Sequence, residues 1–208
     1  MNLFQKIYYH YNNRGIKIVC KKIYEKLKVL YGINNDKKKY PRLINLRTYH
    51  SQRGQDFFIY NILYQKSNGF FVDVGALDGL QGSNTLLLEE SGWNGICIEP
   101  NPEMFKKLKK NRNCILDDSA ASNTHSKVDF IYFPNNLGYS GISDTLKKDI
   151  KNINIKKKIT VNSKKLSTIF KENNAPTLIE YIDIDVEGHE LNVLRGIDFE
   201  NYNFGVIS

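Results

Sequence analysis

The sequence has few cysteines and no long apolar run. Its three cysteines, Cys20, Cys97 and Cys114, lie far apart and form no CxxC pair. They give no disulfide framework and no cysteine-based metal site, so a reducing compartment is expected. No stretch reaches the roughly 18–20 apolar residues of a membrane-spanning helix, and residues 1–30 lack the continuous apolar core of a secretory signal. We predict a cytoplasmic protein.

Acidic residues are scarce at the amino-terminal end. The net charge of +8 suggests a nucleic-acid partner until the charges are located. Residues 1–47 hold 12 Lys and Arg but only 2 Asp and Glu, whereas residues 48–208 hold 18 and 20. The main part of the chain is therefore slightly acidic, and we expect it to bind no nucleic acid.

Residues 1–47 are predicted to form a basic amphipathic helical extension and a linker. Apolar residues recur at helical spacing from Ile16 to Leu30, with lysines around them. Such a helix either packs against its own domain, with its lysines solvated, or docks on a partner or an anionic membrane surface. The second alternative would place the protein at the periphery of a membrane.

The stretch from Phe70 to Gly79 organises the rest of the chain. An apolar run leads into Asp73-Val74-Gly75, and Gly79 follows. The run predicts a buried parallel strand, and the glycines predict a sharp turn where the backbone approaches a ligand. Ser83-Asn84-Thr85 then predicts the start of a helix. Strand, glycine turn and helix are the first unit of a nucleotide-binding α/β sheet.

Two further predicted strands end in polar residues. The second strand, at residues 96–98, is followed by Glu99, whose carboxylate is placed to accept both hydroxyl protons of a ribose. The third, at residues 114–116, leads to Asp118, Ser119 and Ala120, which are polar and then small, as an adenine edge requires.

The glycine spacing favours S-adenosylmethionine over a dinucleotide. Asp73, Gly75 and Gly79 do not reproduce the tighter GxGxxG pattern that holds a pyrophosphate. S-adenosylmethionine has an ammonium group and a ribose but no pyrophosphate, which suits two strands that each end in an acid. A nucleotide-dependent oxidoreductase or a sugar-nucleotide enzyme is the alternative.

Residues 127–166 interrupt the alternation of strands and helices. Val128–Phe133 and Ile159–Val161 predict two strands with a glycine-containing loop between them. We interpret this region as an insertion hairpin or lid. A helix is then predicted over Ser163–Asn173.

In these features the sequence resembles the FkbM-type methyltransferase family, a branch of the class I S-adenosylmethionine-dependent enzymes. The matching segments are Ser51-Gln52-x-Gly54-x-Asp56, Phe71-Val72-Asp73-Val74-Gly75-Ala76-x-Asp78-Gly79, Ser83-Asn84-Thr85, Gly92-Trp93-x-Gly95-x-x-Ile98-Glu99-Pro100-Asn101-Pro102, Ala120-Ala121-Ser122 and Asp183-Ile184-Asp185-Val186-Glu187-Gly188-His189-Glu190. The resemblance implies an α/β fold with a Rossmann-like, doubly wound and mainly parallel sheet. It also implies transfer of a methyl group to a hydroxyl oxygen of a sugar, a glycan or a similar small molecule.

The resemblance assigns roles in binding the cofactor. Asp73, Gly75 and Gly79 resemble the loop at its methionine end, and Asn84 either contacts the carboxylate there or only caps a helix. On the other side, Glu99 resembles the ribose acid, and the segment Asp118-Ser119-Ala120 resembles the adenine contact.

The acid-rich strand end at residues 183–190 supplies the catalytic candidates Asp185, Glu187 and His189. His189 has an ordinary pKa near the working pH and is a candidate general base. Asp185 is alternatively a candidate ligand for a divalent metal that lowers the pKa of the acceptor hydroxyl. A purely structural reading is that Asp185 orders the loop while Glu187 and His189 cap the next helix.

The predicted sheet stops early. Class I sheets normally have seven strands, whereas the fifth predicted strand, at residues 204–208, ends this chain. We expect residues 48–208 to form a methyltransferase domain that is truncated after its fifth core strand. Another chain, for example in a homo-oligomer, would then cover the exposed edge. A cofactor-binding module that is inactive or depends on a partner is the corresponding functional alternative.

Overall fold

The structure, a computed structural model, describes residues 50–63, 66–134, 137–146 and 156–208. The basic extension predicted at residues 1–47 lies outside the described residues, so its helix stays a prediction. Within the described part of the chain, no helix has the length and apolarity that crossing a membrane requires.

A parallel sheet of five strands forms the centre of the molecule, in the order β3-β2-β1-β8-β9. The strands are β1 (Phe70–Val74), β2 (Asn94–Ile98), β3 (Ile115–Asp117), β8 (Leu178–Ile184) and β9 (Asn203–Ile207). In chain order, β1, β2 and β3 are added toward one edge of the sheet, and β8 and β9 are then added on the other side of β1. This confirms the predicted parallel α/β sheet of Rossmann-like type, and it places a topological switch point between β1 and β8.

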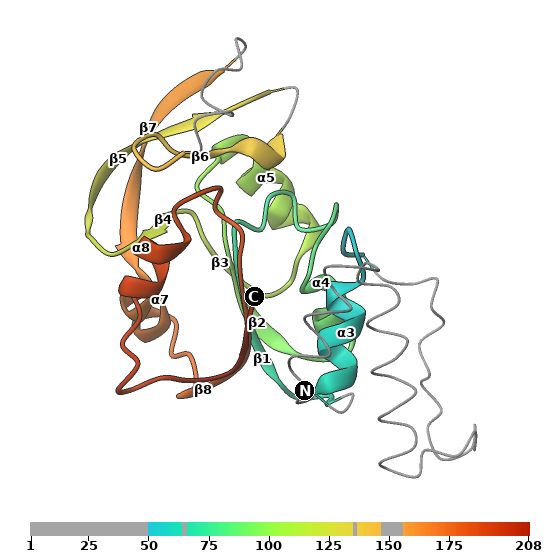
Figure 1. Ribbon diagram of the computed structural model, residues 1–208. Helices are drawn as coiled ribbons and strands as arrows, with labels where there is room; N and C mark the ends of the chain where they lie inside the picture. The colour runs from blue at the N-terminus through green and yellow to red at the C-terminus, as the bar shows by residue number, and fades with distance from the viewer. Residues whose placement is uncertain (1–49, 64–65, 135–136, 147–155) are drawn as a thin grey trace, which may run out of the picture.

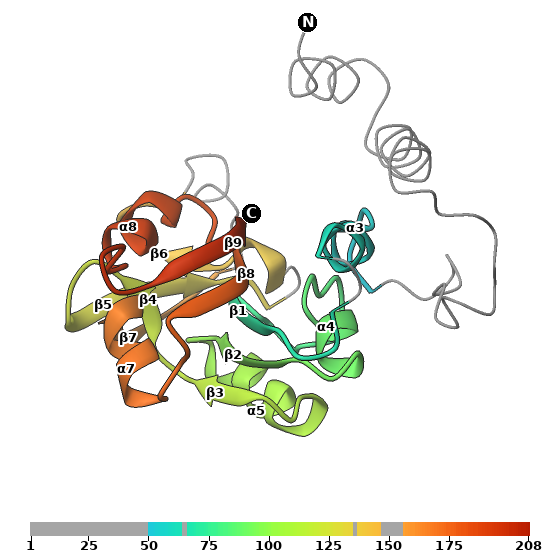
Figure 2. The ribbon, with the colours of Figure 1, turned by 90° about the horizontal axis from the view of Figure 1, so that it is seen from below.

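Helices cover both faces of this sheet (Figures 1 and 2). One face carries α3 (Gln55–Ile62), α4 (Leu86–Glu90) and α5 (Pro102–Asn111), and the other carries α7 (Leu166–Glu172) and α8 (Glu190–Arg195). The central strands are buried on both sides because of these two layers, which explains their nearly continuous apolar sequences.

Local sequence sets the start of α5, whereas strand pairing sets the start of α7. The Asn101 side chain accepts hydrogen bonds from the backbone N–H groups of Glu103 and Met104, and Pro102 occupies the first turn of α5. Helix α7 was predicted from Ser163 but begins at Leu166, because residues 163–165 pair with neighbouring strands instead.

A second sheet takes the place of the predicted insertion hairpin. Its order is β4-β7-β5-β6, with β4 at Ala120–Ser122, β5 at Ser126–Tyr132, β6 at Gly141–Ile142 and β7 at Lys157–Lys165. Strands β5 and β7 form the expected antiparallel hairpin. Two short strands extend it on either side, and the sheet stands at the carboxyl ends of the main-sheet strands (Figure 1).

Candidate functional site

A cavity of about 330 Å³ opens where β1, β2 and β8 end and the second sheet begins. Its volume is within the range of small-molecule sites, about 300–1,000 Å³. The main sheet contributes Val74, Gly75, Ile98, Glu99 and Asp185, and the second sheet contributes Ala120, Ala121, Phe130 and Ile142. The cavity thus lies at the switch point of the parallel sheet, where ligands bind in open α/β folds.

Gly75 fixes the closest approach between β1 and the loop after β8. Its φ of +95° is left-handed, and a Cβ atom there would lie 2.1 Å from the backbone oxygen of Asp185. The N–H of Asp185 donates to the carbonyl of Val74 at 3.0 Å. The glycine is therefore required by the protein's own backbone, and it brings the two strand ends together at the cavity wall.

Glu99 lines the cavity from the end of β2 and is 2% exposed. Its Oε1 accepts the N–H of Asn101 at 2.7 Å, and its Oε2 accepts the N–H of Leu77 at 2.9 Å. Burial raises the pKa of Glu99 to about 7, although these two hydrogen bonds act in the opposite direction. The site therefore holds a buried carboxyl group poised to titrate near neutral pH, where the sequence predicts the ribose acid.

Asp73 lies behind the cavity wall rather than in it. It is 4% exposed, and its Oδ2 accepts a hydrogen bond from Thr85 Oγ1 at 2.5 Å. Burial, and then the carboxylate of Asp183, raise the pKa of Asp73 to about 6, while Arg112 acts to lower it. The structure thus separates Asp73 from Gly75 and Glu99, which line the cavity.

Asn84 also lies outside the cavity lining. Its Nδ2 donates to Asp183 Oδ2 at 2.8 Å, whereas its buried Oδ1 has no hydrogen-bond partner among the described residues. A buried acceptor without a donor is unfavourable, and a bound water is the usual donor at such a position.

Gly79 packs against α5 instead of lining the cavity. Its φ is +78°, and an added Cβ would lie 2.6 Å from both Arg112 Cγ and Leu108 Cδ1. Close packing of the loop on this helix therefore requires a glycine.

The three residues predicted on the adenine side separate in the structure. Ala120 lines the cavity, and Ser119 is buried behind it with its N–H donating to Asp117 at 2.8 Å. Asp118 is exposed and borders a different groove, which Lys106 and Lys127 also line.

The three catalytic candidates, Asp185, Glu187 and His189, all line the cavity. Asp185 is exposed, and Glu187 has a left-handed backbone with φ of +52°. A non-glycine residue in this conformation carries local strain, a feature that clusters at functional sites. Because all three candidates line this cavity, the structure places them together with Gly75, Glu99 and Ala120.

His189 is 6% exposed and connects three parts of the fold. Its Nε2 lies 3.0 Å from Ser122 Oγ, and its Nδ1 lies 2.8 Å from Thr145 Oγ1. Burial lowers the pKa of His189 below its ordinary value. The imidazole is accordingly neutral at pH 7, and both ring nitrogens already have hydroxyl partners.

A divalent metal at Asp185 would need ligands beyond those that converge there. In the residues that the structure describes, no group of three or more His, Cys, Asp and Glu side chains is arranged to hold a metal ion.

Two further residues of the cavity, Gln52 and Tyr139, had only weak signals in the sequence. Gln52 lines it from the segment before α3, where a bridge between Ser51 and Gly82 brings that segment to the loop after β1. Tyr139 lines it from the short 3-10 helix before β6 and is 42% exposed. The sequence signal for Gln52 is the polar segment before the helix. For Tyr139 it is an aromatic stretch, with Tyr132 and Phe133, that either stacks on a sugar or packs in the core; of these three aromatic residues, Tyr139 lines the cavity.

Comparison with protein families identifies a matching family. The model of a family described as "Methyltransferase FkbM domain" matches residues 73–208, which is more than half of the chain. The matched region contains every main-sheet strand from the end of β1 onward, together with the second sheet and the acid-rich loop after β8. No curated protein matches the sequence.

Proposed function

The chain belongs to the methyltransferase FkbM domain family, and from this premise we propose that it transfers the methyl group of S-adenosylmethionine to a hydroxyl oxygen of a sugar, a glycan or a similar small molecule. The observation that carries the proposal is the convergence of Gly75, Glu99 and Asp185 on one cavity at the switch point of the sheet. Gly75 and Glu99 are suited to binding the cofactor, and Asp185 is suited to receiving the proton of the acceptor hydroxyl.

The residues present fit this cofactor. Glu99 offers carboxylate oxygens to the hydroxyls of the ribose, and the small side chains of Ala120 and Ala121 leave room for a flat ring. Asn84 lies outside the cavity lining, so its contact with the methionine end of the cofactor stays a prediction. When bound, the cofactor supplies an electrophilic methyl group on a sulfonium centre.

The protein's part in the reaction is to align the acceptor hydroxyl and to receive its proton. An unactivated alcohol loses its proton late in an in-line displacement, so a carboxylate within hydrogen-bond reach is a sufficient base. His189 is neutral but already hydrogen-bonded through both nitrogens. We assign the proton to Asp185 first, because it lines the cavity and is the most exposed of the three candidates, with Glu187 and His189 shaping the wall beside it. A cation held by Asp185 is the alternative.

The acceptor is proposed to lie against the second sheet. Tyr139 is exposed at the cavity, where its ring can stack on the apolar face of a sugar.

Two predicted contacts with other molecules stay predictions. The first is contact of residues 1–47 with a membrane or a partner, and the second is pairing into a homo-oligomer. Deletion of residues 1–40 followed by vesicle sedimentation tests the first, and light scattering tests the second.

Two measurements test the proposed function. Calorimetry with S-adenosylmethionine, S-adenosylhomocysteine and NAD is expected to show binding of the first two only; binding of NAD alone would support the oxidoreductase alternative instead. Mass spectrometry of a glycan and sugar-nucleotide pool incubated with protein and labelled cofactor is then expected to show a labelled methyl ether. Cofactor binding without transfer to any acceptor would favour the inactive or partner-dependent module.

A further inference from the structure

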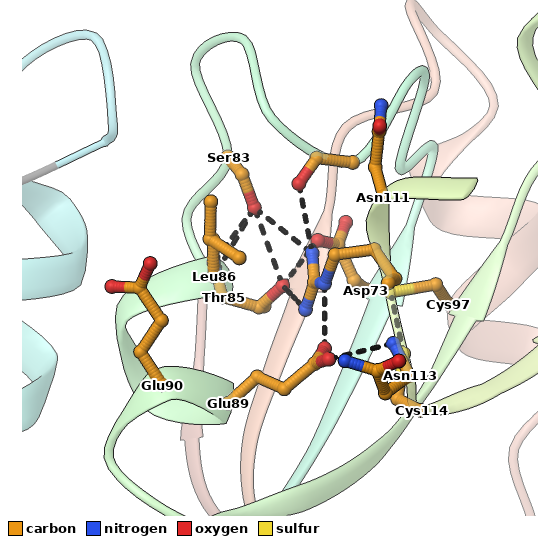
Figure 3. A network of polar contacts seen from close by, with 12 residues as sticks. Asp73, Ser83, Thr85, Leu86, Glu89, Glu90, Cys97, Asn111, Asn113 and Cys114 are labelled. Carbon is orange, nitrogen blue, oxygen red and sulfur yellow. Dashed lines mark hydrogen bonds and ion pairs between the residues drawn. The ribbon is translucent and has the colours of Figure 1, made fainter. Parts of the chain in front are cut away.

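The end of α5 reaches across the loop that connects β1 to α4. Asn111 Nδ2 donates to the carbonyl of Asp78 at 2.7 Å, and Arg112 Nη1 donates to the carbonyl of Gly79 at 3.3 Å. Two consecutive residues of one element thus hold two consecutive carbonyls of the other. Figure 3 shows the polar network at this position, with Asp73, Ser83, Thr85 and Glu89 gathered in it.

The guanidinium of Arg112 is the centre of this network, and its side chain has no exposed surface. Nε donates to Glu89 Oε2 at 2.6 Å, Nη2 donates to Thr85 Oγ1 at 3.0 Å, and Nη1 also lies 3.3 Å from Ser83 Oγ. A buried charge is tolerated only with such partners, because its removal from water is otherwise costly. The planar fork of arginine allows these bonds to form together, which a lysine ammonium cannot reproduce.

Thr85 extends the network to the central strand. Its hydroxyl accepts from Arg112 and donates to Asp73 Oδ2 at 2.5 Å, so the chain of bonds runs Arg112–Thr85–Asp73. Asp73 is two residues before Gly75, at the point where β1 enters the cavity wall. A positive charge from the end of α5 is thereby linked to the start of the cofactor loop.

The loop needs anchors because much of it is in the left-handed region. Gly75, Leu77, Gly79 and Gly82 have φ values of +95°, +49°, +78° and +72°. Leu77 cannot adopt this conformation without cost, yet its N–H holds Glu99 in the cavity. Displacement of the loop would therefore move the carboxylate that we assign to the ribose.

We propose that Arg112 is a positioning residue for cofactor binding. Through its hydrogen bonds to Gly79, Ser83 and Thr85, Arg112 holds the loop from Gly75 to Thr85 in the geometry that binds the cofactor. The inference rests on the proposed function, since it concerns the same cavity. It differs from the expectation that Asp73 and Gly79 contact the cofactor themselves: both are assigned to the support behind the wall.

The test compares affinity with stability. Arg112→Lys keeps the positive charge but loses the fork, and we expect the dissociation constant for S-adenosylhomocysteine to rise about tenfold or more. Ile169→Ala is the control, because Ile169 is fully buried on the opposite face of the sheet and its truncation lowers stability without touching the loop. The control is expected to lower the melting temperature and leave the affinity unchanged. Equal affinities of the two variants would overturn the positioning role.

Thr85 provides a second test if Arg112→Lys does not fold. Thr85→Val replaces the hydroxyl by a methyl group of similar size, and Thr85→Ser retains the hydroxyl. Affinity is expected to fall about tenfold in the first and to stay near that of the unchanged protein in the second. Equal affinities of these two would also overturn the role of the network. Failure of the unchanged protein to bind S-adenosylhomocysteine would instead overturn the proposed function, and the positioning role with it.

Discussion

Asp73 and Asp183 lie side by side on β1 and β8, with their Cα atoms in register in the parallel sheet. Paired positions on neighbouring strands point to the same face, so two carboxyl groups meet there in a buried setting. Burial and this neighbour raise the pKa of Asp73 to about 6. Burial also raises the pKa of Glu99 to about 7. Ionisation of these buried carboxyl groups near neutral pH therefore lowers the free energy of unfolding.

The first prediction concerns stability and pH. A carboxyl group whose folded pKa is raised binds its proton more tightly in the folded than in the unfolded state, so its contribution to stability falls as pH rises from the unfolded to the folded pKa. For Glu99 this window runs from 4.5 to about 7, and the full effect is on the order of 3 kcal/mol. We expect the melting temperature of Glu99→Gln, relative to the unchanged protein, to rise between about pH 4.5 and pH 7 and to level off above that.

The comparison with the variant matters because other groups titrate in the opposite direction. Burial lowers the pKa of His189, so its contribution to stability increases with pH as the unfolded histidine loses its proton. Subtracting the two melting curves removes this shared contribution and isolates Glu99. A difference that does not change with pH would contradict the raised pKa of Glu99.

The second prediction concerns affinity for the cofactor. Glu99→Gln removes the carboxylate that we assign to the ribose hydroxyls. The loss of charged hydrogen bonds of this kind costs about 1.5–3 kcal/mol, or roughly 10- to 150-fold in affinity. Calorimetry with S-adenosylhomocysteine at pH 8 measures this loss. Asp118→Asn is the matched control, because Asp118 is exposed in a different groove. A similar loss in both variants would place Asp118 at the ligand and contradict the assignment of the cavity.

The third prediction concerns the glycine turn. Gly75→Ala would place a Cβ atom 2.1 Å from the backbone oxygen of Asp185, so the loop after β8 must shift and the protein should lose about 2–3 kcal/mol of stability. Gly138 lines the same cavity, but an added Cβ there meets nothing within 4 Å. Chemical denaturation of both variants is the measurement. A Gly75→Ala protein as stable as Gly138→Ala would show that the contact with Asp185 relaxes freely.

The sequence predicted the main sheet well because its strands are local features. Phe70–Val74 and Leu178–Ile184 are apolar runs rich in branched and aromatic residues, and such runs favour buried parallel strands wherever helices cover both faces. The start of α5 could also be predicted from the sequence, since Asn101 and Pro102 are residue types that favour the start of a helix. Three of these strand ends then brought Gly75, Glu99 and Asp185 together, as a parallel sheet requires.

The remaining parts depend on long-range pairing that no local pattern records. Strands β4 and β6 are too short to show a period, and they form only because β7 and β5 lie beside them. Arg112 had no signal of its own, because its partners Gly79 and Thr85 are about thirty residues earlier in the chain. For the same reason Asp73 was interpreted as a ligand contact, although its carboxyl group is held by Thr85 behind the cavity wall.

The last prediction concerns the proton acceptor. In Asp185→Asn the side chain keeps its size but loses its basicity, and the backbone N–H that pairs with Val74 is unchanged. We expect the turnover number to fall about 10²- to 10⁴-fold, while calorimetry shows unchanged affinity for S-adenosylhomocysteine. Glu200→Gln, an exposed carboxylate outside the cavity lining, should match the unchanged protein in both measurements. Full turnover in Asp185→Asn would exclude Asp185 as the base, and the same comparison of Glu187→Gln with His189→Asn would then identify which neighbour receives the proton.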